Sequence, residues 1–285
     1  MDFWINQTFN GISYGALLFL FASGLSLIFG VMKIVNLAHG SYYLLGGYMA
    51  ITLMHHLNSY FFGFLAAPVV VALIGIFMER AFLRKVSGND LGQVLITMGF
   101  ALMIQDLALL IWGGDPFMIH PPKILSGSLA VGHYVFPTYR VFILAIAVLI
   151  GIGLWLFQNK TRGGAIIRAA VDNEAMARGM GINVPLVFMG VYAAGAVLAA
   201  VAGVIGGGFL GIYPGLDFEI LPYAFVIVIL GGRGSLEGAV LGSLIVGLID
   251  NFGKVLFPEI SYFTLFAPMV LILAVKPVGL FGKAS

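Results

Sequence analysis

Long apolar stretches separated by short polar ones dominate the chain. Asp, Glu, Lys and Arg are absent from residues 3–32, 34–78, 141–159 and 179–216. A membrane-spanning helix needs about 20 mostly apolar residues, because the hydrocarbon core is about 30 Å thick and a helix rises about 1.5 Å per residue. Stretches of this length predict helices that cross a membrane.

The stretch 34–78 is too long for one crossing, and the polar sequence His55-His56-Leu57-Asn58-Ser59 divides it into two helices joined by a tight turn. The whole pattern predicts an all-α, polytopic transmembrane helical bundle of about eight or nine membrane segments, forming one domain over residues 1–285. The expected segments are 9–31, 38–54, 60–79, 91–112, 139–157, 186–209, 219–231, 236–252 and 260–275. Between 219 and 252 the apolar runs are short and rich in glycine, so tilted, broken or re-entrant segments are alternatives there.

Composition supports a membrane protein and excludes several classes of function. Hydrophobic residues make up 61% of the chain and charged residues 9%, against about 25% charged in soluble domains. A soluble enzyme, a nucleic-acid-binding protein and a disordered linker are thereby excluded. The 39 glycines fit a bundle in which small residues let helices approach closely. Those of the sixth segment, including Gly195 and Gly203, predict close helix packing or a smooth pore lining.

The basic residues predict the orientation of the bundle, since cytoplasmic loops retain Lys and Arg. With the N-terminus outside, the nine segments leave only Lys123, Arg140 and Lys254 on the outer side. The other members of the 14 lysines and arginines, Lys283 included, then lie in the cytoplasm. We therefore expect an N-out, C-in protein with a long, proline-containing external loop at 113–138.

The longest polar connection, residues 161–184, has the sequence TRGGAIIRAAVDNEAMARGMGINV. Its alanines favour a helix, and Glu174 and Arg178 have the spacing of an i,i+4 ion pair. Gly179 and Gly181 would end that helix. The sequence predicts a short amphipathic helix on the cytoplasmic face. From the residues alone, this helix is either a solvated connector or a docking element for another protein.

Three stretches together resemble a known family. One is the polar connection, with Thr161-Arg162-Gly163, Arg168-Ala169, Asn173, Ala177 and Gly181-Ile182-Asn183; the others are GVMKIVNLAHGS at residues 30–41 and LGGRGSLEGAVLGS at residues 230–243. This arrangement is similar to that of the permease subunits of branched-chain amino acid ABC importers. The chain length resembles the shorter of the two permease types that such importers pair.

The resemblance implies a permease that imports branched-chain amino acids by alternating access, in the inner membrane of a bacterial-type cell. It implies a cytoplasmic coupling loop at 160–185, and the coupling residues would be Arg162, Gly163, Arg168, Asn173, Ala177, Gly181 and Ile182. The implied partners are cytoplasmic ATPase subunits, a second permease subunit and an external soluble binding protein, which the loop at 113–138 would receive.

No cofactor and no catalytic residue are expected in the chain itself, since ATP would be used by the partner subunits. The sequence has no GxxxxGK[ST] motif, and Gly231-Gly232-Arg233-Gly234-Ser235 lacks the lysine of a phosphate-binding loop. This glycine-rich stretch instead predicts a tight cytoplasmic turn anchored by Arg233. The five histidines lack HExxH or another ligand spacing, so no metal site is predicted.

Four polar residues are candidates for the translocation path. Asn36 and His39 lie at the expected cytoplasmic mouth of the second segment. They either anchor that segment among hydrated headgroups or, as the family motif favours, shape the path or its inner gate. Asp106, beside Gln105, is the acid that falls well inside a predicted segment. A carboxylate inside the membrane costs at least about 2.5 kcal/mol, so Asp106 should face the bundle or a wet cavity. It would then line the translocation path or make a buried hydrogen bond. The third alternative is that its side chain snorkels to the membrane surface.

Other functions remain open at this stage. An ABC permease for urea or short amides would share the same motifs. A self-contained secondary transporter or channel would need its own ion or proton relay, for which Asp106 is the candidate acid. A structural or assembly membrane protein would need no polar path at all.

Overall fold

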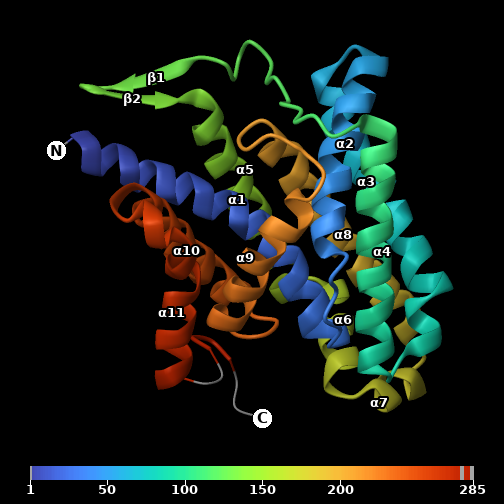
Figure 1. Cartoon of the computed structure of the whole chain (residues 1–285). Helices are drawn as coiled ribbons and strands as arrows, with labels where there is room; N and C mark the ends of the chain where they lie inside the picture. The colour runs from blue at the N-terminus through green and yellow to red at the C-terminus, as the bar shows by residue number, and fades with distance from the viewer. Residues whose placement is uncertain (1, 277–278, 283–285) are drawn as a thin grey trace.

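The computed structural model describes residues 2–276 and 279–282, and most of this part is helical (Figure 1). Its elements in chain order are α1 (Asp2–Met32), α2 (His39–Leu57), α3 (Tyr60–Ala81), η1 (Leu83–Val86), α4 (Asp90–Trp112), β1 (Ser128–Val131), β2 (Tyr134–Pro137), α5 (Thr138–Lys160), α6 (Arg162–Asp172), α7 (Glu174–Gly179), α8 (Val184–Gly207), α9 (Leu216–Gly231), α10 (Leu236–Leu256), η2 (Pro258–Ile260) and α11 (Ser261–Val275). Lys283, which the orientation argument assigned to the cytoplasm, lies outside the described residues.

Every predicted membrane segment coincides with a helix of the described chain. Among the described residues, six helical stretches are long and apolar enough to cross a membrane: α1, α3 with η1, α4, α5, α8 and α10. The helices α9 and α11 have 16 and 15 residues, whereas a helix that crosses the membrane needs about 20 residues. The all-α polytopic fold is therefore confirmed, whereas the count of eight or nine crossings and the N-out orientation stay predictions.

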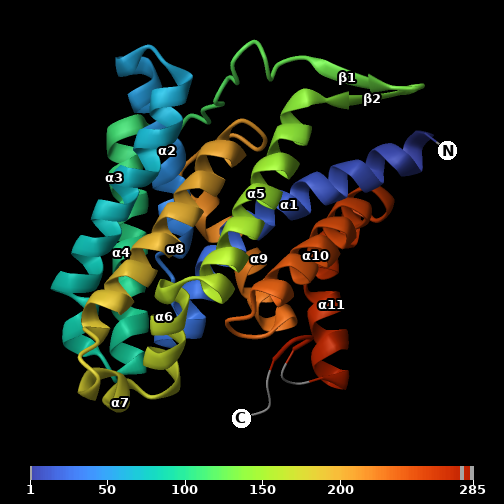
Figure 2. The same ribbon diagram turned by 180° about the vertical axis from the view of Figure 1, so that it is seen from behind.

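The two ends of the bundle carry different connections. Figures 1 and 2 show α6 and α7 at one end and the β1–β2 hairpin with the α2–α3 turn at the other. The hairpin departs from an all-α fold, and Gly132 at φ +63° lets β1 turn back on β2. Phe117 also pairs with Ile212, so the stretch expected as the external loop is tied to the α8–α9 connection.

Close contacts between small residues hold the centre of the bundle together. The helix α1 packs on α10, α8 and α5, and α8 also packs on α2 and α3. A Cβ placed on Gly24 would lie 2.7 Å from the carbonyl oxygen of Gly195, and one on Gly15 would lie 2.8 Å from that of Ser243. These separations are too short for any side chain, and a Cβ on Gly203 of α8 would likewise collide with the carbonyl oxygen of Tyr43. The prediction that glycines of the sixth segment, now α8, serve close packing is therefore confirmed.

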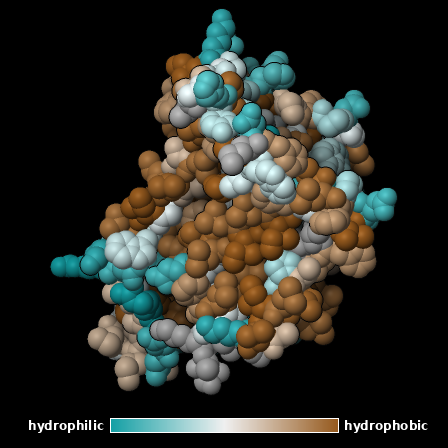
Figure 3. All heavy atoms as spheres, turned by 90° about the vertical axis from the view of Figure 1, so that its left-hand side faces the viewer, coloured by the Kyte–Doolittle hydropathy of each residue, from teal (hydrophilic) through white to brown (hydrophobic). Residues whose placement is uncertain are grey.

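The outward faces of the helices are apolar. Large exposed side chains lie along α3, α4 and α5, among them Phe61, Leu73, Leu110 and Leu149. Figure 3 shows that apolar side chains also cover most of the face on the side of α10 and α11. Continuous apolar surfaces of this size are unfavourable in water, and they suit contact with lipid or with other membrane subunits.

The connection between α1 and α2 turns back into the bundle. The backbone N–H of Leu37 donates to Thr97 Oγ1 on α4 at 3.2 Å, and His39 Nε2 lies 2.9 Å from the carbonyl oxygen of Phe21 on α1. Phe21 precedes the end of α1 at Met32 by eleven residues, or about 16 Å along the helix. The helix α2 therefore starts deep inside the bundle, not at its edge.

Candidate functional site

The α6–α7 segment, residues 161–183, projects from one end of the bundle (Figure 2). Capping side chains set its limits. Thr161 Oγ1 accepts the backbone N–H of Gly164 at 3.1 Å and starts α6, while Asn183 Oδ1 accepts that of Leu186 at 3.2 Å and starts α8. Side-chain acceptors at helix starts satisfy amide groups that have no partner within the helix. The sequence therefore fixes where the segment leaves and rejoins the membrane helices.

The prediction of one continuous helix was wrong, because the segment breaks into α6 and α7 at Asn173. Asn173 has extended backbone angles (φ −152°, ψ 97°), and its side-chain oxygen accepts the N–H of Met176 at 2.9 Å. Asparagine stabilises such a cap at the expense of a continuous helix, whatever its alanine neighbours favour. The expected ion pair is confirmed, with Arg178 Nη2 lying 2.5 Å from Glu174 Oε1.

One face of the segment anchors it to α8. Ala170, Ala177 and Val184 form a small buried cluster against which Ile182 and Phe188 pack. The backbone N–H of Ile182 donates to the carbonyl oxygen of Ala177 at 3.0 Å. Of the residues for which the resemblance implied a coupling role, Ala177 and Ile182 therefore hold the segment in place.

The other face of the segment is free. Arg162, Arg168 and Asn173 are exposed, and so are two residues that the sequence analysis did not single out, Met176 (65% exposed) and Met180 (78%). The two methionines are four residues apart, and this spacing in the sequence could have indicated that they lie on one side of the segment. Gly163 lets α6 pass close to Phe157, because a Cβ at this position would lie 3.1 Å from the Phe157 ring. Gly181 has φ +84°, a backbone conformation that favours glycine.

The three stretches that carry the family resemblance meet beside α6. A groove of about 490 Å³ is lined by Gly30 and Val31 from the first stretch, Arg168 and Asp172 from the polar connection, and Arg233, Ser235 and Glu237 from the third. Arg168 donates to the carbonyl oxygen of Gln158 at the end of α5. The glycine-rich stretch forms the expected turn, and Arg233 lies over the Phe29 ring at 5.3 Å. Residues far apart in the sequence thus build one surface at this end.

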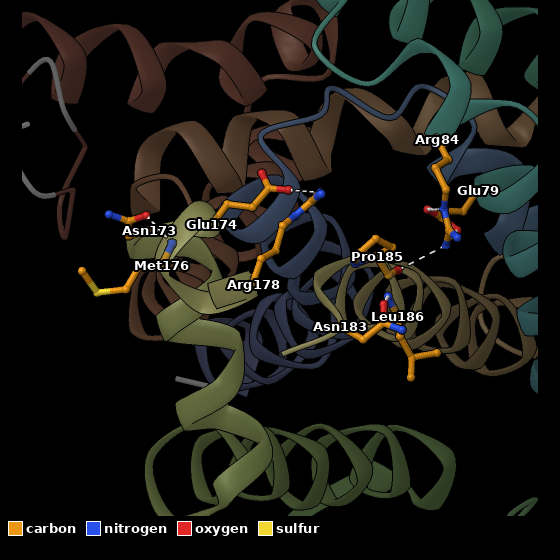
Figure 4. Close-up of polar contacts among 9 residues, drawn as sticks. All are labelled: Glu79, Arg84, Asn173, Glu174, Met176, Arg178, Asn183, Pro185 and Leu186. Atoms are coloured by element: carbon orange, nitrogen blue, oxygen red, sulfur yellow. Dashed lines mark hydrogen bonds and ion pairs between the residues drawn. The ribbon is translucent and has the colours of Figure 1, made fainter. Parts of the chain in front are cut away.

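A further polar contact, next to the α6–α7 segment, joins the end of α3 to the start of α8 (Figure 4). Glu79, in the last turn of α3, accepts two hydrogen bonds from Arg84, at 3.1 Å from Nε and 2.8 Å from Nη2. The same Nη2 donates to the carbonyl oxygen of Pro185 at 3.2 Å, in the first turn of α8. A planar guanidinium is suited to this arrangement because it presents several donors in a fixed fork.

Asn36 and His39 are buried inside the bundle. Both are 0% exposed, so hydration by headgroups at the cytoplasmic mouth does not describe them. Asn36 Oδ1 accepts the N–H of Ala38 at 3.1 Å, and the His39 ring stacks on Phe21 at 4.9 Å. Asn36 Nδ2 and His39 Nδ1 have no hydrogen-bond partner among the described residues.

Three buried acids escaped the sequence analysis. Asp217 accepts a hydrogen bond from Ser41 at 3.0 Å, and Asp250 lies 2.7 Å from Lys254; the third is Glu79, described above. The i,i+4 spacing of Asp250 and Lys254 could have indicated their pair. The contact between Ser41 and Asp217 joins α2 to α9 across the fold, and no local pattern announces it.

Asp106 points away from the bundle, contrary to expectation. The buried face of α4 contains Ile104 and Ala108, and Asp106 lies two residues from each, about 200° around the helix. Its side chain is exposed on an otherwise apolar helix. A buried hydrogen bond within this chain is therefore excluded for Asp106. Gln105 is partly buried and approaches Gly215 at the start of α9.

The fold and these sites define a class of protein. Apolar helices of membrane-crossing length surround a core held together by glycines, and a capped polar segment extends from one end. The chain has the architecture of a multi-pass integral membrane protein.

The family follows from comparison with known proteins. The model of the family described as "Branched-chain amino acid transport system / permease component" matches residues 7–275, so the chain belongs to this family. It is 30% identical to the high-affinity branched-chain amino acid transport system permease protein BraD of Pseudomonas aeruginosa, over 98% of this chain and 96% of the relative. It is also 30% identical to LivH of Escherichia coli K12, over 99% and 96%. A probable LivH of Methanocaldococcus jannaschii is 28% identical, over 84% and 78%.

Proposed function

We propose that the chain is the transmembrane permease subunit of an ATP-driven importer of branched-chain amino acids in the cell membrane. The observation that carries this proposal is the α6–α7 segment, which is capped at both ends, anchored on α8 and exposed on its outer face. Family membership supports the same function, and the relatives named above are branched-chain amino acid permeases.

Separate ATPase subunits dock on the α6–α7 segment in this proposal. Met176 on α7 and Met180 directly after it are large exposed apolar side chains, and methionine adapts its shape to a partner surface. Arg162, Arg168 and Asn173 add polar contacts around them. Gly181 lets the chain return to α8 so that the segment stays rigid while it is held.

A second permease subunit covers the outer face of α4. Asp106 on that face would cost at least about 2.5 kcal/mol against lipid, whereas a partner subunit or a hydrated path between subunits removes this cost. The exposed faces of α3 and α5 carry large apolar residues such as Phe61 and Leu149 and suit lipid. Gln105 and Asp106 would then line the translocation path between the two permeases.

The transport cycle is alternating access. Closure of the ATPase subunits draws the α6–α7 segments together, and the bundle opens to the outside to receive substrate from a binding protein docked at residues 113–138. Asn36 lies in the non-helical connection between α1 and α2, and His39 is the first residue of α2, so a shift of this connection would open an inner gate and offer their unpaired nitrogen atoms to substrate or water.

The direct test is reconstitution with the co-purifying ATPase subunits and binding protein in liposomes. We expect ATP-dependent uptake of leucine, isoleucine or valine, with ATP hydrolysis stimulated by the loaded binding protein. If urea or short amides are taken up with ATP and these amino acids are not, the proposed substrate is wrong and the ATP-driven import stands. Uptake by this chain alone, driven by a proton gradient, would contradict the proposal as a whole.

A further inference from the structure

A small cavity separates the α6–α7 segment from the end of α3. It has a volume of about 150 Å³, and its lining includes Glu79 and Arg84 on one side and Glu174 and Arg178 on the other. Figure 4 shows the two ion pairs facing each other across this space, with Pro185 near Arg84. Charged groups from α7 and from the end of α3 thus line one cavity, while the α6–α7 segment packs on α8 through the apolar cluster around Ala177.

The pair of Glu79 and Arg84 differs from an ordinary surface ion pair. The Glu79 side chain is only 3% exposed, whereas Arg84 is 37% exposed. A buried carboxylate without its cation is strongly unfavourable, so Glu79 holds Arg84 in place. By contrast, both partners of the Glu174–Arg178 pair are largely exposed, and pairs of that kind contribute little.

The Arg84 side chain joins the end of α3 to the start of α8, and further along the same two helices Tyr192 donates to the sulfur of Met78. The guanidinium of Arg84 is fixed by two bonds to Glu79 and donates a further bond to the Pro185 carbonyl. Pro185 follows Asn183 and Val184, which cap α8 and anchor the α6–α7 segment. A movement of the segment that shifts the start of α8 therefore pulls on Arg84 and, through Glu79, on α3.

We propose that Arg84, held by Glu79, is the positioning residue that transmits movement of the α6–α7 segment to α3 during transport. This inference rests on the proposed function, because it requires the segment to be moved by an ATPase. Arg84 touches no substrate in this account. It acts by making the start of α8 and the end of α3 move as one unit.

The test replaces Arg84 with lysine in the reconstituted complex. Lysine keeps the charge that Glu79 needs, but a single ammonium on a flexible stem cannot hold both Glu79 and the Pro185 carbonyl in fixed geometry. We expect normal membrane insertion, normal ATPase docking and continued ATP hydrolysis. Hydrogen bonds of charged groups are strong enough that uptake per ATP should fall about tenfold.

A second variant and a control complete the design. Glu79→Gln should lower uptake per ATP in the same way, because Arg84 is then no longer held. Arg80→Lys, at an exposed position beside Glu79, should match the wild type. If either test variant fails to fold, the double variant Glu79→Gln/Arg84→Gln, which leaves no unpaired charge, is measured in its place.

The outcomes separate this inference from the function on which it rests. A normal ratio of uptake to hydrolysis in Arg84→Lys and Glu79→Gln would overturn it. So would a loss of uptake that only parallels lost ATPase docking, because Arg84 would then be merely structural. The proposed function itself fails if variants on the α6–α7 segment, such as Gly181→Val, also transport normally.

Discussion

Replacing Gly203 with alanine is expected to stop the chain from folding. Gly203 lies on α8 where α2 crosses it, and a Cβ at this position would collide with the backbone carbonyl of Tyr43. Overpacking against side chains costs about 1–3 kcal/mol, and backbone cannot move aside as a side chain can. The expected result is little monodisperse protein in detergent and a strongly lowered melting temperature for what remains.

Gly190→Ala on the same helix is the matched control. Nothing lies within 4 Å of a Cβ at Gly190, so this variant should fold as the wild type or slightly better, because alanine favours helix. If Gly203→Ala instead matches Gly190→Ala in yield and melting temperature, the close crossing of α2 and α8 is wrong.

Replacing Gly181 with valine should uncouple the transporter without harming the membrane domain. Gly181 has φ +84°, where a β-branched residue is strained. Left-handed backbone costs about 1–2 kcal/mol for a residue with a side chain, which changes an equilibrium by a factor of roughly 5–30. We expect normal insertion, with uptake and substrate-stimulated ATP hydrolysis both reduced by about this factor. Arg168→Ala, which removes the hydrogen bond to Gln158, should act in the same direction.

The control for this prediction lies two residues away. Gly179 ends α7 with helical backbone, and a Cβ there meets nothing within 4 Å, as at Gly181. Gly179→Val adds the same side chain to the same exposed surface without the strained φ. Equal transport by the two valine variants would show that the turn after α7 has no part in coupling.

Helix positions were largely predictable from the sequence, and the depth of particular residues was not. Charge-free stretches located the helices because lipid tolerates few ionised groups. The sequence predicts Asn36 and His39 at the cytoplasmic mouth of the second segment, because the basic residue Lys33 precedes them. The backbone instead turns back into the bundle after α1, a path set by contacts with Phe21 and Thr97, which no periodic pattern reveals.

The polar sites show the same limit. The Glu174–Arg178 pair could be predicted because both residues lie on one helix. The break between α6 and α7 at Asn173 differs from the predicted single helix, because the capping preference of this asparagine outweighs the helix propensity of the neighbouring alanines. The partnership of Arg84 with Pro185 spans 101 residues and depends on how α3 and α8 pack, so only the fold brings these residues together.

We expect a separate ATPase to bind the exposed face of the α6–α7 segment, and site-directed labelling can detect this binding. The chain contains no native cysteine, so Met176→Cys provides a single thiol on that face. A membrane-impermeant maleimide should label it from the cytoplasmic side, and bound ATPase subunits should protect it. Met118→Cys, exposed at the opposite end of the bundle, should be labelled from outside whether or not the ATPase is present. Labelling of Met176→Cys from outside, or labelling at the same rate with and without the ATPase, would contradict the account.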